Sequence, residues 1–214
     1  MSKKQGRIGE IPTGTFDFDI DARERQVIGD GPKLVPLKLD EIGEDAMAQI
    51  YGIQDAFNLP HDTPIPDVSL ITLRNPAMFR CQMAMGIELA GSGTIPGRER
   101  ELAVLRVAWL AGAAFEWSEH VDIGKKFGVT EEEIDRIKHG STAEGWTEHE
   151  AAVLAAVEEC LADSCISDET WDTLAKTYGE KQLLELPMLI GSYLGTAFQQ
   201  NSIRVPVKGG FRYR

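Results

Sequence analysis

Apolar residues recur at helical spacing through the stretch Arg98–Gly128. They fall on two faces of one helix, the first with Leu102, Leu105 and Trp109 and the second with Ala103, Val107, Leu110 and Ala114. A helix that is apolar almost all round is typical of a protein core. Its charges cluster at the start, and Arg106 is the only one further in. A Gly-Ala break follows, so the pattern predicts a buried helix and then a second helix over Phe115–Phe127.

Apolar periodicity and capping signals indicate further helices along the chain. They are expected over Asp40–Ile53 and Pro76–Ala90, from Thr130 to His139, from Thr147 to Cys160, after Ser167, and over Lys181–Ile203. Three prolines make the segment 58–66 a loop. Pro187 lies inside the last helix and is expected to kink it or split it in two. The pattern therefore predicts an all-α fold in one helical domain, residues 40–206.

The first part of the chain, Met1–Leu39, differs from the rest in its glycine and proline content. Repeated glycines and prolines interrupt it, so it does not resemble a helix, and the run TFDFDID suggests a short exposed strand. Two interpretations stay open: a leader without fixed structure, or an extended arm that packs on a neighbouring subunit. The apolar residues that could anchor such an arm are Phe16, Phe18, Leu34, Val35 and Leu37. A basic, glycine-rich tail, residues 207–214, closes the chain.

Charge and cysteine content narrow the class of protein. The chain has 214 residues and a formal net charge of −12, which argues against nucleic acid as a partner because phosphate binding needs a basic face. No apolar run approaches the roughly 20 residues needed to cross a bilayer, and no signal-peptide pattern is visible. Cys81, Cys160 and Cys165 lack metal or redox spacing, so we expect free thiols and a cytoplasmic location.

Glu116 and His120 are the first candidates for chemistry. They lie four residues apart, and on a helix that spacing places both side chains on one face, close enough to touch. A carboxylate that binds one imidazole nitrogen fixes the tautomer and leaves the other nitrogen for proton transfer. The alternative is a hydrogen bond that serves only the core. Together with Glu119 the pair offers metal ligands, but HExxH is absent and no third nitrogen or sulfur ligand is near, so we expect no metal and no cofactor.

The run RERELAVLRVAWLAGAAFEWSEHVDIGKKFGVTEEEI resembles the core motif of the carboxymuconolactone decarboxylase family, which includes alkylhydroperoxidase D. Its specific parts are REREL, FEWSEH and GVTEEEI; the resemblance is strong from Pro76 to about Gly140 and looser through Pro206. It implies an alkylhydroperoxidase D-like helical bundle, and it does not cover about the first seventy residues, so the irregular N-terminal arm of this fold is expected from the glycine and proline content alone. It also implies an acid/base role for His120 and for Glu101, which on sequence grounds alone reads as an acid near a helix start.

The resemblance has one departure. Redox members of the family carry Cys-x-x-Cys followed by a histidine four residues after the second cysteine. Counting back from His120, those cysteine positions are Ala113 and Glu116, so both thiols are missing. The dithiol peroxidase chemistry does not carry over, and the sequence resembles the decarboxylase-type branch more closely.

The leading hypothesis for function is therefore a cofactor-independent lyase of the carboxymuconolactone decarboxylase type. It would use acid/base chemistry on a small organic acid or lactone, with decarboxylation favoured by the resemblance, which also implies a role in aromatic compound catabolism. Hydration, dehydration, isomerisation and lactone opening use the same groups. The alternatives are a thiol-dependent antioxidant enzyme of the alkylhydroperoxidase type and a non-catalytic helical oligomer that binds a ligand.

Three further residues are candidates for substrate binding. Arg106, inside an apolar helix, either pairs with a buried carboxylate or binds a substrate carboxylate in bidentate fashion. Trp117 either packs in the core or stacks on a substrate, and His61 could line the mouth of a pocket. Several helices look apolar on more than one face, so a homo-oligomer is expected, a dimer, trimer or hexamer with the N-terminal segment at its interface.

Overall fold

The computed structural model describes residues 20–207, and their regular structure is helical throughout, without a strand. This confirms the all-α prediction. The helices are α1 Ile20–Val27, α2 Glu44–Ala56, α3 Asp67–Thr72, α4 Pro76–Ile87, α5 Gly97–Leu110, α6 Ala114–Lys126, α7 Glu131–His139, α8 Glu148–Asp163, α9 Asp168–Ala175 and α10 Glu180–Ile203. A 3-10 turn, η1 Leu39–Glu41, precedes α2, and a π-helical turn, η2 Glu88–Ser92, extends α4. None of the helices within residues 20–207 is long and apolar enough to span a membrane.

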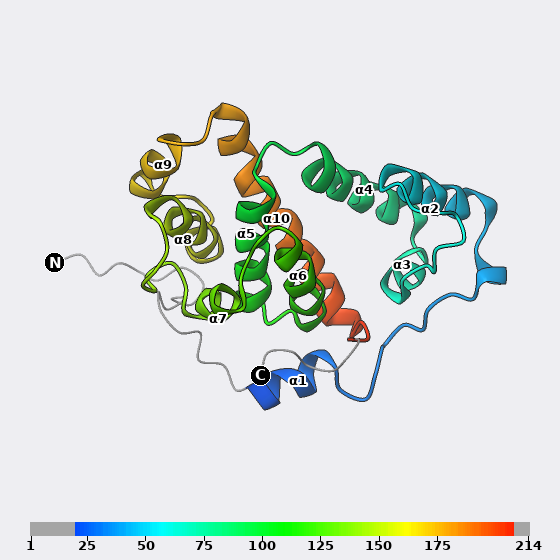
Figure 1. Cartoon of the computed structure of the whole chain (residues 1–214). Coiled ribbons are helices and arrows are strands. Elements are labelled where there is room, and N and C mark those ends of the chain that lie inside the picture. Colours follow the sequence, from blue (N-terminus) through cyan, green and yellow to red (C-terminus); the bar gives the residue numbers. More distant parts are fainter. Residues whose placement is uncertain (1–19, 208–214) are drawn as a thin grey trace.

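Two hydrophobic clusters divide the described chain into a main bundle and a smaller lobe. The main bundle packs α6, α8 and α10 against α5, which is buried along almost its whole length. Figure 1 shows α5 and α10 side by side at the centre, with α7, α8 and α9 on one side and α2, α3 and α4 on the other. The smaller lobe has its own cluster, built around Ala46, Ile50, Leu73 and Phe79.

The tight connection between α5 and α6 sets the geometry of the site. α5 ends in the turn Ala111–Ala113, where Gly112 has a positive φ of 55° and Ala113 donates its N–H to the carbonyl of Ala108. Glycine is the usual residue at this position because it adopts the left-handed conformation without strain. A β-carbon on Gly112 would also collide with the side chain of Arg23. The turn therefore folds α6 back along α5, and the two helices pack on each other.

Capping signals in the sequence predict several helix starts correctly. Thr130 and Thr147 each accept a hydrogen bond from the backbone N–H three residues on, as the capping box requires, and Ser167 caps α9 in the same way. Asn75 accepts from the N–H of Met78 with Pro76 at the first helical position. These signals work because each one depends only on residues within a single turn.

Two expectations are corrected. The segment before Leu39 is not free of helix, because α1 spans Ile20–Val27, a run with neither glycine nor proline. Its residue Arg23 donates to the carbonyl of Gly112 at 3.1 Å, and Val27 is part of the main core, so this part of the arm packs on its own chain. Pro187 does not split the last helix either, since α10 is continuous through it.

The rest of the N-terminal segment follows the surface of the same chain. The N–H of Lys33 bonds to the carbonyl at the end of α10, on Ile203, and the N–H of Leu37 bonds to the carbonyl of Leu70 in α3. Leu34 and Val35 are exposed, whereas Leu37 packs against the smaller cluster. The expected strand TFDFDID, except for its last two residues, lies outside the described residues, as do Phe16, Phe18 and the basic tail from residue 208.

Candidate active site

Glu101 and His120 make a polar contact between α5 and α6. Glu101 extends from α5 and His120 from α6, and the imidazole Nδ1 lies 2.7 Å from the carboxylate Oε2. Both residues are buried, Glu101 with 1% of its surface exposed and His120 with 8%. Glu101 therefore does more than favour a helix start, because its carboxylate lies inside the protein against the imidazole.

Glu116 occupies the other side of the same imidazole. Its Oε1 lies 3.3 Å from Nε2 of His120, as the four-residue spacing on α6 predicts. Glu116 is also in the first turn of α6, where a negative charge interacts favourably with the helix dipole. The structure thus differs from the simple expectation, because neither nitrogen of His120 is left without a carboxylate partner.

The two carboxylates set the protonation state of the imidazole. Burial by itself lowers the pKa of a histidine, but the hydrogen bonds and negative charges of Glu101 and Glu116 outweigh it and raise the pKa of His120 to about 9. At neutral pH the imidazole is therefore a cation. Arg100 supports the arrangement from behind, since its Nε donates to Glu101 Oε1 at 3.0 Å and it is itself buried.

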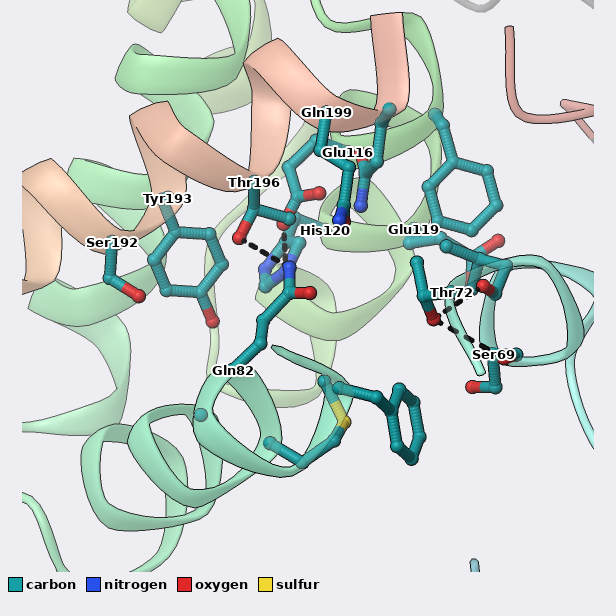
Figure 2. Close-up of a pocket in the computed structure, with 16 residues that line it drawn as sticks. Ser69, Thr72, Gln82, Glu116, Glu119, His120, Ser192, Tyr193, Thr196 and Gln199 are labelled. Carbon is teal, nitrogen blue, oxygen red and sulfur yellow. Dashed lines mark hydrogen bonds and ion pairs between the residues drawn. The ribbon is translucent and has the colours of Figure 1, made fainter. Parts of the chain in front are cut away.

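A cavity of about 210 Å³ opens beside this cluster, between the smaller lobe and the main bundle. Its wall comes from α3, α4, α6 and α10, and Glu116 and His120 both line it, whereas Glu101 does not. Figure 2 shows His120 and Glu116 at the back of this space, with Gln82 reaching up from α4 and Tyr193 and Thr196 extending from α10. The cluster is therefore accessible to a small molecule.

The remaining wall is mostly neutral. Gln82 spans the space between α4 and α10 and donates its amide N–H to Thr196 Oγ1 at 3.1 Å. The ring of Tyr193 meets the ring of His120 edge to face, with centroids 5.1 Å apart. Burial and then the neighbouring carboxylates raise the pKa of Tyr193, so its phenol stays protonated at neutral pH. The buried side-chain oxygens of Gln199 and Gln200 have no hydrogen-bond partner within residues 20–207.

Sequence reasoning missed these α10 residues. The available signal is weak: two adjacent glutamines, Gln199 and Gln200, follow the largely apolar middle part of the helix. A buried polar side chain needs a partner, so such a pair marks a site where a ligand or another helix approaches. Neither Gln82 nor Tyr193 carries even that much signal, because polar and aromatic residues are common where helices pack.

The structure does not bring the expected substrate-binding residues into the cavity. Arg106 is 0% exposed, and its guanidinium binds Glu158 at 2.8 Å and the carbonyls of Ile137 and Lys138. Trp117 is also buried, packed against Trp109. Of the two roles considered for each residue, Arg106 therefore pairs with a buried carboxylate and Trp117 packs in the core, and neither faces the cavity.

His61 also lies away from the cavity. It is exposed, pairs with Asp55 at 2.8 Å and stacks on the ring of Tyr51. No group of three or more His, Cys, Asp or Glu side chains within residues 20–207 is arranged to hold a metal ion.

The thiols are remote from a dithiol arrangement. Ala113 and Glu116 occupy the two positions where redox members of the family have cysteine, and all three cysteines of the described chain are free. Burial raises the pKa of Cys160 to about 11, so its thiol is protonated at neutral pH and a poor nucleophile.

The fold is that of alkylhydroperoxidase D-like proteins. A peroxidase-related protein from Ralstonia eutropha JMP134 with an alkylhydroperoxidase AhpD core superposes with a TM-score of 0.69 at 16% identity, covering 84% of this chain and 94% of that one. A protein of unknown function from Agrobacterium tumefaciens, suggested to be the antioxidant defence protein AhpD, gives 0.59 at 21% identity over 65% and 96%.

The debrominase Bmp8 has the same architecture. A cysteine-to-alanine variant of it in complex with 2,3,4-tribromopyrrole gives a TM-score of 0.65 at 17% identity, covering 82% of this chain and 91% of that one. Residues 76–159 match the model of the carboxymuconolactone decarboxylase family. No curated protein sequence matches the chain.

Proposed function

We propose that this protein is an enzyme that moves a proton on a small organic acid or lactone, with Glu116 and His120 as the groups that contact the substrate. The observation that carries this proposal is an imidazolium held between two buried carboxylates in the wall of a cavity. Strongly perturbed titratable groups in a cleft are typical of acid/base sites. A purely ligand-binding oligomer would not need a charged cluster of this kind inside its pocket.

The geometry divides the work among three side chains. Glu116 faces the cavity and is the proton acceptor; a proton taken from the carbon next to a substrate carbonyl goes to its carboxylate. Once Glu116 has taken up this proton it is neutral and no longer pairs with Nε2 of His120, so the imidazolium can stabilise the negative charge that develops on the carbonyl oxygen. In an isomerisation the proton is then returned from Glu116 to a different atom of the substrate. Glu101 acts as a positioning residue, since it contacts His120 and not the cavity.

Proton transfer of this kind serves several reactions. Decarboxylation forms an enolate-like species by loss of CO₂, isomerisation forms one by loss of a proton, and both then protonate it at carbon. Dehydration and eliminative lactone opening form the enolate by loss of a proton, and it then expels hydroxide or a carboxylate. The match of residues 76–159 to the carboxymuconolactone decarboxylase family model favours a lyase. A thiol-dependent peroxidase is the less favoured function, because a carboxylate occupies one cysteine position and alanine the other.

Hydrogen exchange tests the proposal without knowledge of the natural substrate. A panel of small lactones, keto acids and unsaturated acids is incubated with the protein in D₂O, and deuterium incorporation next to the carbonyl is followed by proton NMR. We expect the wild-type protein to accelerate exchange in at least one compound. Glu116→Gln, which keeps the shape but not the base, should lower that rate by about 10² or more.

Two further variants complete the experiment. His120→Ala should also abolish the exchange while circular dichroism shows a folded helical protein. Glu144→Gln removes the same charge from an exposed loop and should retain the wild-type rate. Wild-type exchange in Glu116→Gln, or no acceleration with any compound of the panel, would contradict the proposal.

A further inference from the structure

We propose that the cavity beside His120 takes a small molecule that has no negative charge and donates hydrogen bonds, such as a hydroxylated lactone or an amide, and rejects the anion of an organic acid. This inference rests on the proposed function, since it treats this cavity as the substrate site. It selects one of the two substrate classes that the function leaves open.

The charged residues of the cavity wall disfavour an anionic ligand. Two glutamates, Glu116 and Glu119, line the cavity, and none of the described lining residues is a lysine or an arginine. An anion that enters a partly buried site must lose its water, and only a free cation or several donors would offset that cost. Here it would instead meet carboxylates of its own sign.

The one cation in the wall is already neutralised. His120 has a carboxylate on each ring nitrogen, at 2.7 Å and 3.3 Å, so neither N–H is left to bind a substrate carboxylate. Arg100 is bound to Glu101 and to the carbonyl of Ala90. The bidentate arginine that a substrate carboxylate prefers is therefore absent from this cavity as described.

The glutamines of α10 favour a ligand that donates hydrogen bonds. The side-chain oxygens of Gln199 and Gln200 are buried and have no hydrogen-bond partner among the described residues, and both residues line the cavity. Gln200 has only 6% of its surface exposed. A buried acceptor without a donor is costly, and a ligand that supplies an O–H or N–H group would remove that cost. At these two positions the wall presents unpaired acceptors, which match a ligand that donates hydrogen bonds.

The cavity volume limits the size of the ligand. About 210 Å³ is the space that about seven water molecules occupy in the liquid. A single ring with one or two substituents fits this space. Since a decarboxylation needs a substrate carboxylate, which leaves as CO₂, a ligand without one points to isomerisation or lactone opening within the proposed proton transfer.

Binding of three compounds of nearly equal shape tests this inference: benzamide, benzoate and methyl benzoate. Benzamide is uncharged and has N–H donors, benzoate is its anionic counterpart, and methyl benzoate is uncharged without a donor. Dissociation constants come from NMR titrations in which the ring resonances of His120 and Tyr193 report binding in the cavity. We expect benzamide to bind at least tenfold more tightly than benzoate, and more tightly than methyl benzoate.

A charge reversal at the wall provides the matched variant. Glu119→Lys places a cation at the cavity and should raise the affinity for benzoate at least tenfold, because it removes one repulsion and adds one attraction. Glu144→Lys changes the net charge equally in an exposed loop and should leave the ratio of the two affinities as in the wild type. The inference is overturned if benzoate binds as tightly as benzamide, if methyl benzoate matches benzamide, or if none of the three binds in the cavity.

The outcome is separable from that of the proposed function, because binding requires no turnover. Discrimination against benzoate together with unchanged exchange in Glu116→Gln would refute the proton-transfer proposal and leave the ligand class standing. Equal binding of benzoate and benzamide together with slower exchange in Glu116→Gln would refute the ligand class alone.

Discussion

Replacing Glu101 by glutamine should lower the pKa of His120. As a result, the free energy of unfolding should change less with pH than it does in the wild type. In the wild type, burial opposes the imidazolium, and the two carboxylates outweigh it and raise the pKa from 6.5 to about 9. Glutamine keeps the size of the side chain and a carbonyl that Nδ1–H can donate to, but it removes the closer of the two negative charges, at 2.7 Å. The substitution therefore weakens one of the two interactions that hold the imidazole in its charged form.

The size of the effect on stability follows from the difference between the pKa of His120 in the folded and in the unfolded state. A pKa of about 9 in the folded state against 6.5 in the unfolded state corresponds to about 3 kcal/mol of unfolding free energy. Because the folded-state pKa is the higher one, this contribution is fully present below pH 6.5 and is lost as the pH rises through 9. We expect Glu101→Gln to lower the pKa of His120 by at least one pH unit, which corresponds to about 1 kcal/mol or more of unfolding free energy.

The measurement is an NMR titration of the histidine ring carbons, together with urea unfolding at several pH values between 6 and 9.5. The chain has four histidines, and the resonance missing from His120→Asn identifies the one of interest. Glu144→Gln, which removes an exposed carboxylate, serves as the control and should leave both the pKa and the stability profile unchanged. A wild-type His120 that titrates near 6.5, or one that still titrates near 9 in Glu101→Gln, would refute the electrostatic reasoning.

Three further predictions concern the rest of the molecule. Arg106→Met should lower the free energy of unfolding by about 3–5 kcal/mol in urea titrations, because it leaves Glu158 buried without its cation; a loss below 1 kcal/mol would argue against this account. Replacing all three cysteines by serine should preserve fold and hydrogen-exchange activity; a collapse of activity in the folded variant would bring back a thiol mechanism. Light scattering should show a homo-oligomer at micromolar concentration, because Leu184, Met188 and Phe198 are exposed on α10. Residues of α10 and α4 also line an apolar groove of about 500 Å³. A stable monomer would contradict this prediction.

The parts of the site that could be predicted from sequence are those that depend on neighbouring residues. Glu116 and His120 are one helical turn apart, so a helix over Phe115–Phe127 was enough to place them together. The contact between His120 and Glu101 spans two helices, and their separation depends on how α5 and α6 pack after the turn at Gly112. Only the resemblance to the family pointed to Glu101, because spacing gives no angle between helices.

The parts that could not be predicted depend on distant segments. Nothing near Arg106 in the sequence identifies its partner, which lies on α8, 52 residues away. The cavity is formed by residues of four helices, and α3 among them was not expected at all. Apolar periodicity shows that a helical face is buried, but it does not show which helix covers it or where the covering is incomplete. The presence of α1 was missed for a different reason, since the density of glycine and proline around it concealed a short run without either.

The arginines of the central helix explain how negative charge comes to face the cavity. Arg98 binds Glu133 and Glu150, Arg106 binds Glu158, and Arg100 binds Glu101. Three cations of α5 are thus taken up by carboxylates, and two of them tie α5 to α7 and α8, away from the cavity. What remains at the cavity wall is one imidazolium shared between Glu101 and Glu116, and the carboxylate of Glu119. A wall with more carboxylates than cations favours proton uptake and disfavours the entry of an anion, and for that reason our proposal is proton transfer on an uncharged substrate.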